Sequence, residues 1–70
     1  MTDPVIPLGV ALKREMARVR DEVLPQYEEA GLPGAASLMC HDLDWAATVL
    51  AEGDVVAMLH AYEALKGWEP

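Results

Sequence analysis

The chain has 70 residues and a formal net charge of −7, with five Lys and Arg against twelve Asp and Glu. Four of the bases lie in residues 1–20, whereas residues 21–65 carry nine acids and no Lys or Arg. A nucleic-acid binder needs a basic surface to displace counterions from phosphates, so this balance argues against direct nucleic-acid binding. It argues equally against attachment to an anionic membrane by charge.

Length and cysteine count limit how the chain can be stabilised. Seventy residues make one small domain, and the single cysteine excludes an internal disulfide. Helix packing or association with another chain must therefore supply the stability. The N-terminus shows neither a basic leader nor a long apolar run, so we expect a cytoplasmic protein.

Residues 1–7 are predicted to form an extended arm, because Pro4 and Pro7 disfavour helix in the residues before them. Apolar residues spaced by three and four predict a helix from about residue 8 to about residue 30. Pro25 either kinks or breaks this helix. Gly31 suits the position after its end.

Two further helices are predicted, over residues 33–52 and 55–66. Pro33 suits a first helical position, and Asp54 is a good N-cap residue. Because Gly53 and Asp54 alone connect these helices, we expect an antiparallel hairpin. The fold class is therefore all-α, a small three-helix bundle forming a single domain over residues 8–70.

The helix over residues 33–52 has two apolar arcs, which predicts a central helix packed on two sides. Leu38, Trp45 and Val49 form the second arc, and Asp42 falls between the two. An unpaired buried carboxylate is costly. Asp42 therefore either pairs with a base of the first helix (Arg14, Arg18 or Arg20) or with the arm, or serves as a polar contact to a partner.

The helix over residues 55–66 is predicted to bury a stripe made of Val55, Met58, Leu59, Tyr62 and Leu65. Its opposite face carries Ala57, Ala61 and Ala64, which permit close approach of another helix. This alanine face is the basis of an alternative function, that of a homo-oligomeric structural or accessory protein.

The densest polar cluster joins Cys40, His41, Asp42 and Asp44, with His60 and Glu63 on the next helix. Helical geometry points His41 outward and does not bring His60 level with it, so we expect solvated histidines with no metal and no cofactor. Cys40 has acids rather than bases nearby, which disfavours a reactive thiolate. We expect it to be a small semi-buried residue, and we expect no enzyme.

The arginines of the first helix and the tryptophan after the last helix each have more than one interpretation. Arg14 and Arg18 lie opposite the apolar stripe, and Arg18 can pair with Glu22 on a solvated face. Trp68 either folds back over the core or serves as an interface anchor.

The segments VRDEVLPQY at residues 19–27 and GDVVAMLHAYEALK at residues 53–66 resemble short uncharacterised helical proteins of bacteriophages and prophages. The resemblance covers most of the chain after the arm. It implies a phage accessory protein in the bacterial cytoplasm. Small acidic phage proteins often bind and block a host defence or nucleic-acid-handling complex, and anti-CRISPR proteins are similar in size and charge.

These features together favour a non-enzymatic acidic protein-binding module, an inhibitor of the anti-CRISPR type. It would occupy a basic nucleic-acid-binding surface of a host protein or nucleoprotein complex. The predicted partner-binding residues are Glu28, Glu29, Asp42, Asp44, Trp45, Glu52, Asp54, Glu63 and Trp68.

Overall fold

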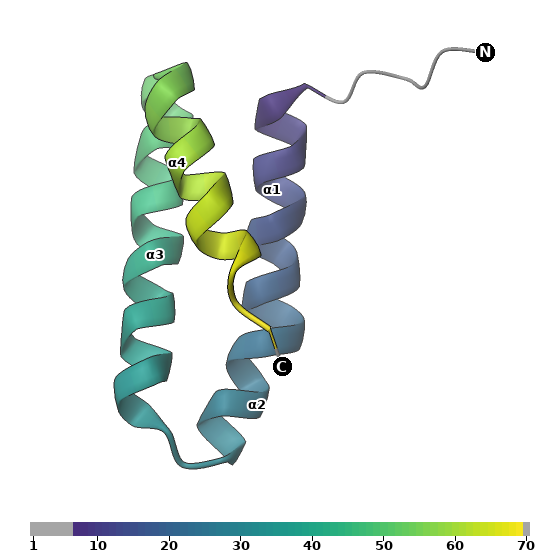
Figure 1. Ribbon diagram of the computed structural model, residues 1–70, viewed down its shortest axis with the longest axis vertical. Helices are drawn as coiled ribbons and strands as arrows, with labels where there is room; N and C mark the ends of the chain where they lie inside the picture. The colour runs from purple at the N-terminus through teal and green to yellow at the C-terminus, as the bar shows by residue number, and fades with distance from the viewer. Residues whose placement is uncertain (1–6, 70) are drawn as a thin grey trace, which may run out of the picture.

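The computed structural model describes residues 7–69, and within that range the chain is helical apart from short connections. The helical elements, in chain order, are α1 (Leu8–Arg18), a π-helix (Val19–Val23), α2 (Leu24–Glu29), α3 (Pro33–Glu52) and α4 (Val55–Lys66). The first three elements are continuous and form one helical rod over residues 8–29. This first rod, α3 and α4 are the three helical rods of the molecule (Figure 1). The predicted all-α class and helical bundle are confirmed. Residues 1–6 of the predicted arm lie outside the described residues.

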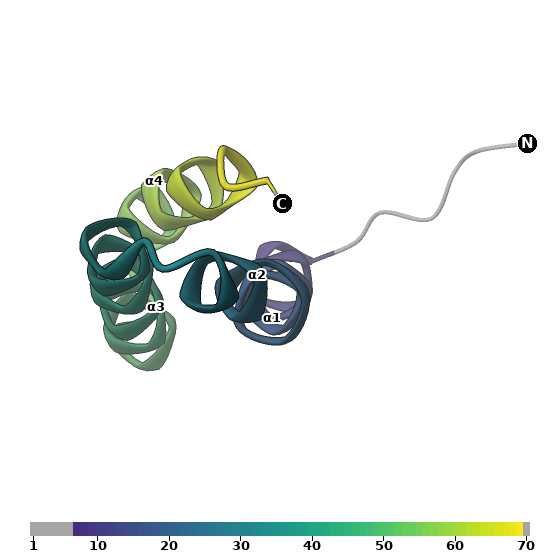
Figure 2. The ribbon, with the colours of Figure 1, turned by 90° about the horizontal axis from the view of Figure 1, so that it is seen from below.

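The π-helix explains how the first rod continues past Pro25. Proline has no backbone N–H, and its ring would collide with the carbonyl four residues earlier, that of Asp21. One wider turn replaces the regular helical turn here, and the N–H of Leu24 bonds to the carbonyl of Val19, five residues back. The rod is therefore kinked rather than broken. Figure 2 shows α2 slightly displaced from α1 when the rod is seen end-on.

The chain changes direction at two glycines with left-handed backbone. Gly31 has φ 73° and follows α2, where the N–H of Leu32 bonds to Tyr27 O at 3.1 Å in a Schellman arrangement. Gly53 has φ 74° and ends α3. Asp54 then caps α4, because its Oδ1 accepts from the N–H of Ala57 at 3.2 Å.

The core receives apolar side chains from all three rods. Its buried members are Leu12, Val19, Val23, Met39, Ala46, Val49, Met58, Ala61 and Leu65. Helix α4 packs against both α1 and α3, while α2 packs against α3 at the other end (Figure 1). The molecule measures 43 × 30 × 15 Å, so it is flat and leaves much of each helix exposed.

The predicted stripe of α4 is correct at Met58 and Leu65, which are buried, and wrong at its other large aliphatic residues. Val55 and Leu59 are 65% and 48% exposed, whereas Ala61 is 1% exposed and lies in the core. Because α4 lies against two helices at once, its buried face includes Ala61 together with Met58 and Leu65 and leaves Val55 and Leu59 outside it. Of the predicted alanine face, Ala61 is therefore used within the chain, while Ala57 and Ala64 are half-buried.

The second apolar arc of α3 is divided in the structure. Val49 is buried, but Leu38 is 61% exposed and Trp45 is 38% exposed. Helix α3 therefore buries one side and leaves large apolar side chains beside its exposed side. No helix among residues 7–69 is both long enough and apolar enough to cross a membrane.

Candidate binding surface

Trp68 folds back onto the helices and contacts Asp42. Its Nε1–H donates to Asp42 Oδ2 at 2.8 Å, and both residues are half-buried. The carboxylate of Asp42 therefore finds its partner in the C-terminal tail, and the proposed pairing with Arg14, Arg18 or Arg20 is wrong. Of the alternatives for Trp68, the structure shows the folded-back one.

Two further contacts hold the same tail. The Tyr27 hydroxyl donates to Glu69 O at 2.8 Å, and its ring meets that of Trp68 edge to face with centroids 5.8 Å apart. Tyr27 lies on α2 and Asp42 on α3, so Trp68 connects these two helices. We infer a structural role for Trp68 and Asp42, although both were predicted to contact a partner.

Arg18 holds the end of α4. Its Nε donates to Glu15 Oε2 at 2.7 Å, and its Nη2 donates to the carbonyls of Leu65 at 3.2 Å and Trp68 at 2.9 Å. These are carbonyls in the last turn of α4 and in the tail that follows it, where a positive charge is favourable. Arg18 is half-buried, so the predicted pair with Glu22 on a solvated face is wrong.

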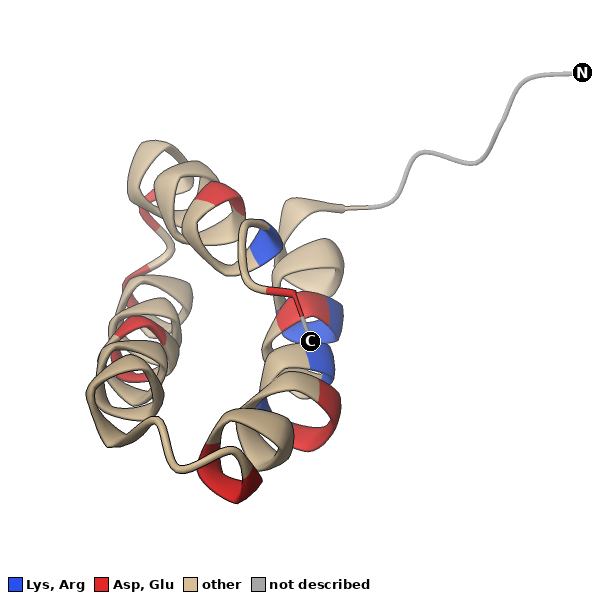
Figure 3. Cartoon of the chain, turned by 60° about the horizontal axis from the view of Figure 1, so that its bottom comes forward, with Lys and Arg blue, Asp and Glu red and all other residues tan. Residues whose placement is uncertain are grey.

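The remaining acids that were predicted to bind a partner lie at the two turns beside α3, on α3 itself and on α4. Glu28 and Glu29 lie at the α2–α3 turn, and Glu52 and Asp54 lie at the α3–α4 turn. Asp44 lies between them on α3, next to Trp45, and Glu63 lies on the exposed side of α4. The acids are therefore spread over the rods and do not form one cluster (Figure 3).

We call the exposed side of α3, with the turns at its two ends, the α3 surface. Its charged residues are Glu28, Glu29, Asp44, Glu52 and Asp54, all exposed. Its large apolar residues are Leu38 and Trp45 at its edge. Lys and Arg are absent from residues 21–65, so no base of α2 or α3 offsets these carboxylates.

The bases of the first rod are partly engaged elsewhere. Arg18 is held at the end of α4, and Arg20 makes two hydrogen bonds to the carboxylate of Asp21, at 2.9 and 3.2 Å. The hydrogen bond from Arg20 lowers the pKa of Asp21 below its ordinary value. Both side chains are largely exposed, so this pair contributes little to stability.

The Cys40–Asp44 region does not form a chemical centre in the structure. His41, Asp44, His60 and Glu63 are exposed, and residues 7–69 contain no group of three side chains that could hold a metal ion. Cys40 is exposed rather than semi-buried. It faces the α2 side of α3, where no third helix covers it.

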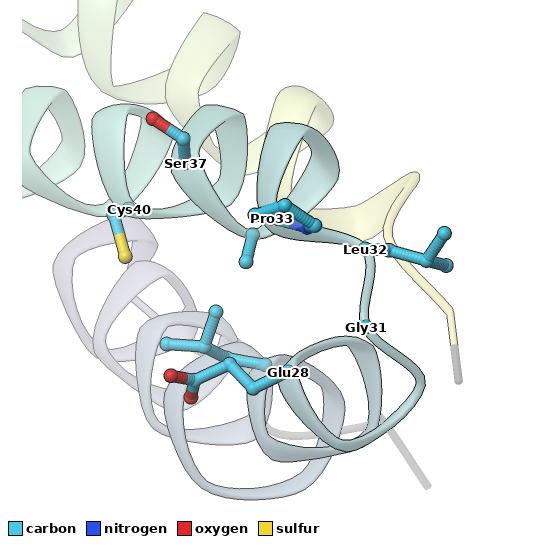
Figure 4. A pocket seen from close by; sticks show the side chains of 8 residues that line it. Glu28, Gly31, Leu32, Pro33, Ser37 and Cys40 are labelled. Atoms are coloured by element: carbon cyan, nitrogen blue, oxygen red, sulfur yellow. The ribbon is translucent and has the colours of Figure 1, made fainter.

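A groove of about 630 Å³ lies between α2 and the first turns of α3, a size typical of small-ligand sites. Its lining residues are Leu24, Glu28, Gly31, Leu32, Pro33, Ala36, Ser37 and Cys40. In Figure 4 the sulfur of Cys40 points toward α2, the carboxylate of Glu28 lies across from it, and the Ser37 hydroxyl points away. Sequence reasoning missed this groove, because it depends on how α2 and the first turns of α3 lie against each other after the turn at Gly31.

Comparisons with protein-family models, with curated proteins and with solved structures found no match to this chain. The features that bear on function are therefore the α3 surface and the groove that opens at one end of it.

Proposed function

We propose that this protein is a non-enzymatic binding module whose α3 surface occupies a basic, nucleic-acid-binding surface of a host complex. The setting follows the resemblance to phage proteins: an inhibitor of the anti-CRISPR type, acting in the bacterial cytoplasm. The observation that carries the proposal is the set of exposed carboxylates on α3 (Asp44 and Glu52) and at the turns beside it (Glu28, Glu29 and Asp54), which no base of residues 21–65 offsets.

The physical basis is electrostatic complementarity. Carboxylates spaced along a helix of 20 residues, about 30 Å long, can face a row of bases that otherwise contacts phosphates. Such complementarity speeds association and excludes partners of the same sign. The negative charge also prevents the protein from binding the nucleic acid itself.

Apolar contacts supply the part of the affinity that charge alone does not. Aromatic residues are enriched among the few interface residues that carry most binding energy. Trp45 is 38% exposed, and Asp44 precedes it in the chain. We therefore assign Trp45 as the apolar anchor of the α3 surface, with Leu38 beside it.

The test captures a partner from bacterial lysate with tagged protein and compares two charge-reversed variants. Asp44→Lys with Glu52→Lys reverses two acids of the α3 surface. Glu22→Lys with Glu63→Lys makes the same charge change at two exposed acids outside it. Asp54 is left intact, since its carboxylate caps α4 and its loss would weaken the fold.

We expect the wild type and the Glu22/Glu63 variant to retain one nucleic-acid-handling complex, and the Asp44/Glu52 variant to lose it. Added nucleic acid should displace the protein from that complex in a mobility-shift assay. Equal capture by both variants would contradict the proposal. So would a captured complex that binds its nucleic acid and this protein at the same time.

A further inference from the structure

The groove between α2 and α3 is apolar along its base and carries one charged side chain. Leu24, Pro33 and Ala36 supply apolar surface, and Glu28 is the charged residue that lines it. The carboxylate of Glu28 lies across the groove from the sulfur of Cys40 (Figure 4). This combination suits a ligand with an apolar stem and a positively charged head.

The two helix ends at the groove do not change this electrostatic preference, because their partial charges are opposite and leave the charge of Glu28. The first rod ends here, and the last turn of α2 contains no base. The C-terminus of a helix carries about half a negative charge, which adds to the full charge of Glu28. The N-terminus of α3 opens at the same place and contributes about half a positive charge. The net potential of the groove is therefore negative.

We propose that this groove binds an arginine side chain from a basic segment of the protein partner. The methylene stem lies on the apolar base, and the guanidinium pairs with the Glu28 carboxylate. Arginine suits the site because its planar head pairs with a carboxylate through two parallel hydrogen bonds and is weakly hydrated. This inference rests on the proposed function, and it adds a defined site for one side chain of the basic partner.

The lone cysteine allows the groove to be tested without labelling another position. Cys40 lines the groove and is exposed, so a bound side chain should shield it from iodoacetamide, an uncharged reagent. The probe is a short peptide of alternating arginine and leucine. Its counterpart carries citrulline, in which a neutral urea replaces each guanidinium.

Glu29 provides a matched control for Glu28. It is the next residue of α2, it is exposed, and it does not line the groove. Glu28→Gln and Glu29→Gln therefore make the same change in net charge, and they differ in whether the groove loses its carboxylate.

We expect the arginine peptide to slow alkylation of Cys40 in the wild type and in Glu29→Gln. Glu28→Gln should raise the half-maximal peptide concentration by about two- to fivefold, the range for one exposed ion pair. The citrulline peptide should protect less than the arginine peptide. Backbone amide shifts at Ser37 in NMR spectra should follow the same order.

Two results would overturn the inference. Equal protection in Glu28→Gln and Glu29→Gln would show a general charge effect rather than a site. An unchanged alkylation rate in the presence of the arginine peptide would show that the peptide leaves Cys40 uncovered and therefore docks outside the groove.

Failure of this inference is separable from failure of the proposed function. Asp44 and Glu52 lie outside the groove, so their reversal leaves it intact. If the charge-reversed variant loses the partner and the peptide does not protect Cys40, the α3 surface stands as the binding surface and the groove proposal is rejected. If the peptide protects Cys40 but the charge-reversed variant still retains the partner, the proposal for the α3 surface is rejected.

Discussion

The side chain of Trp68 shows how much one residue after the last helix contributes to this small fold. Its indole bonds to Asp42 of α3 and packs on Tyr27 of α2, while its carbonyl accepts from Arg18 at the end of α1. A bundle of this size buries little surface, so each satisfied half-buried polar group is a notable part of its stability. The tail thus joins three helices that would otherwise contact one another less.

Replacing Trp68 with Phe should lower the free energy of unfolding by about 1–2 kcal/mol. An aromatic ring remains at this position, but the half-buried carboxylate of Asp42 loses the indole N–H that donates to it at 2.8 Å. Urea denaturation followed by circular dichroism measures the change. Trp45→Phe is the control: the indole of Trp45 makes no hydrogen bond within residues 7–69, so this substitution should change stability by less than about 0.5 kcal/mol. Equal effects of the two substitutions would contradict the role of the indole N–H.

Arg18→Met should cost a similar amount, about 1–2 kcal/mol, because two carbonyls at the end of α4 lose their donor. Arg14→Met is the matched control on the same helix, at an exposed position, and should stay within about 0.5 kcal/mol of the wild type. Thermal unfolding of both variants gives the comparison. A loss as large in Arg14→Met would point to net charge rather than to the contact.

These residue contacts were the part of the structure least accessible to sequence reasoning. Nothing in the spacing of Asp42 and Trp68, 26 residues apart, shows that they meet. The sequence indicated that Asp42 needed a partner, because it falls within an apolar arc. Which partner it finds depends on the path of the tail after α4, and local periodicity does not determine that path.

At the scale of elements, the spacing of apolar residues correctly predicted the all-helical class. It did not correctly predict the buried face of every helix. Pro25 allowed two predictions, a kinked helix and a broken helix. In the structure a π-helix over Val19–Val23 lets the helix continue past the proline. In α4 the predicted stripe was right at Met58 and Leu65, but it included Val55 and Leu59, which are exposed, and left out Ala61, which is buried. A helix that touches two neighbours buries the side between them, and that side is known only once the neighbours are placed.

Gly53→Ala and Gly34→Ala should change stability in opposite directions. Neither glycine has an atom near the position of an added Cβ, so space does not distinguish them. Gly53 has φ 74°, where an L-residue costs about 1–2 kcal/mol. Gly34 lies in α3 with a φ outside the left-handed region, so alanine should stabilise the protein by about 0.5–1 kcal/mol. Chemical denaturation measures both, and destabilisation by Gly34→Ala would contradict the helical geometry at that turn.

At the scale of the whole molecule, the distribution of charge matters more than its sum. The sequence indicated a basic first helix followed by acids alone, and the structure shows where those groups lie. Arg18 is held at an internal contact, two exposed acids lie on α3 (Asp44 and Glu52), and three more lie at the turns before and after it (Glu28, Glu29 and Asp54). Which acids share a surface could not be predicted from the sequence, because it depends on which side of α3 the other rods cover.

The flat shape has a consequence for how such a surface could act. With a thickness of 15 Å, the molecule leaves one side of α3 uncovered. A partner can therefore contact both turns of α3 at once, together with the groove at one of them. A compact bundle with four helices would cover part of this surface.

The central claim is that the α3 surface binds a basic partner, and the most direct measurement is the affinity of the captured complex for the two double variants. Each changes net charge by the same amount, at Asp44 and Glu52 or at Glu22 and Glu63. We expect Asp44→Lys with Glu52→Lys to weaken binding by at least about tenfold, because like charges then face each other across the contact. Glu22→Lys with Glu63→Lys should stay within about twofold of the wild type. Equal losses for both variants would contradict a defined surface and leave net charge as the cause.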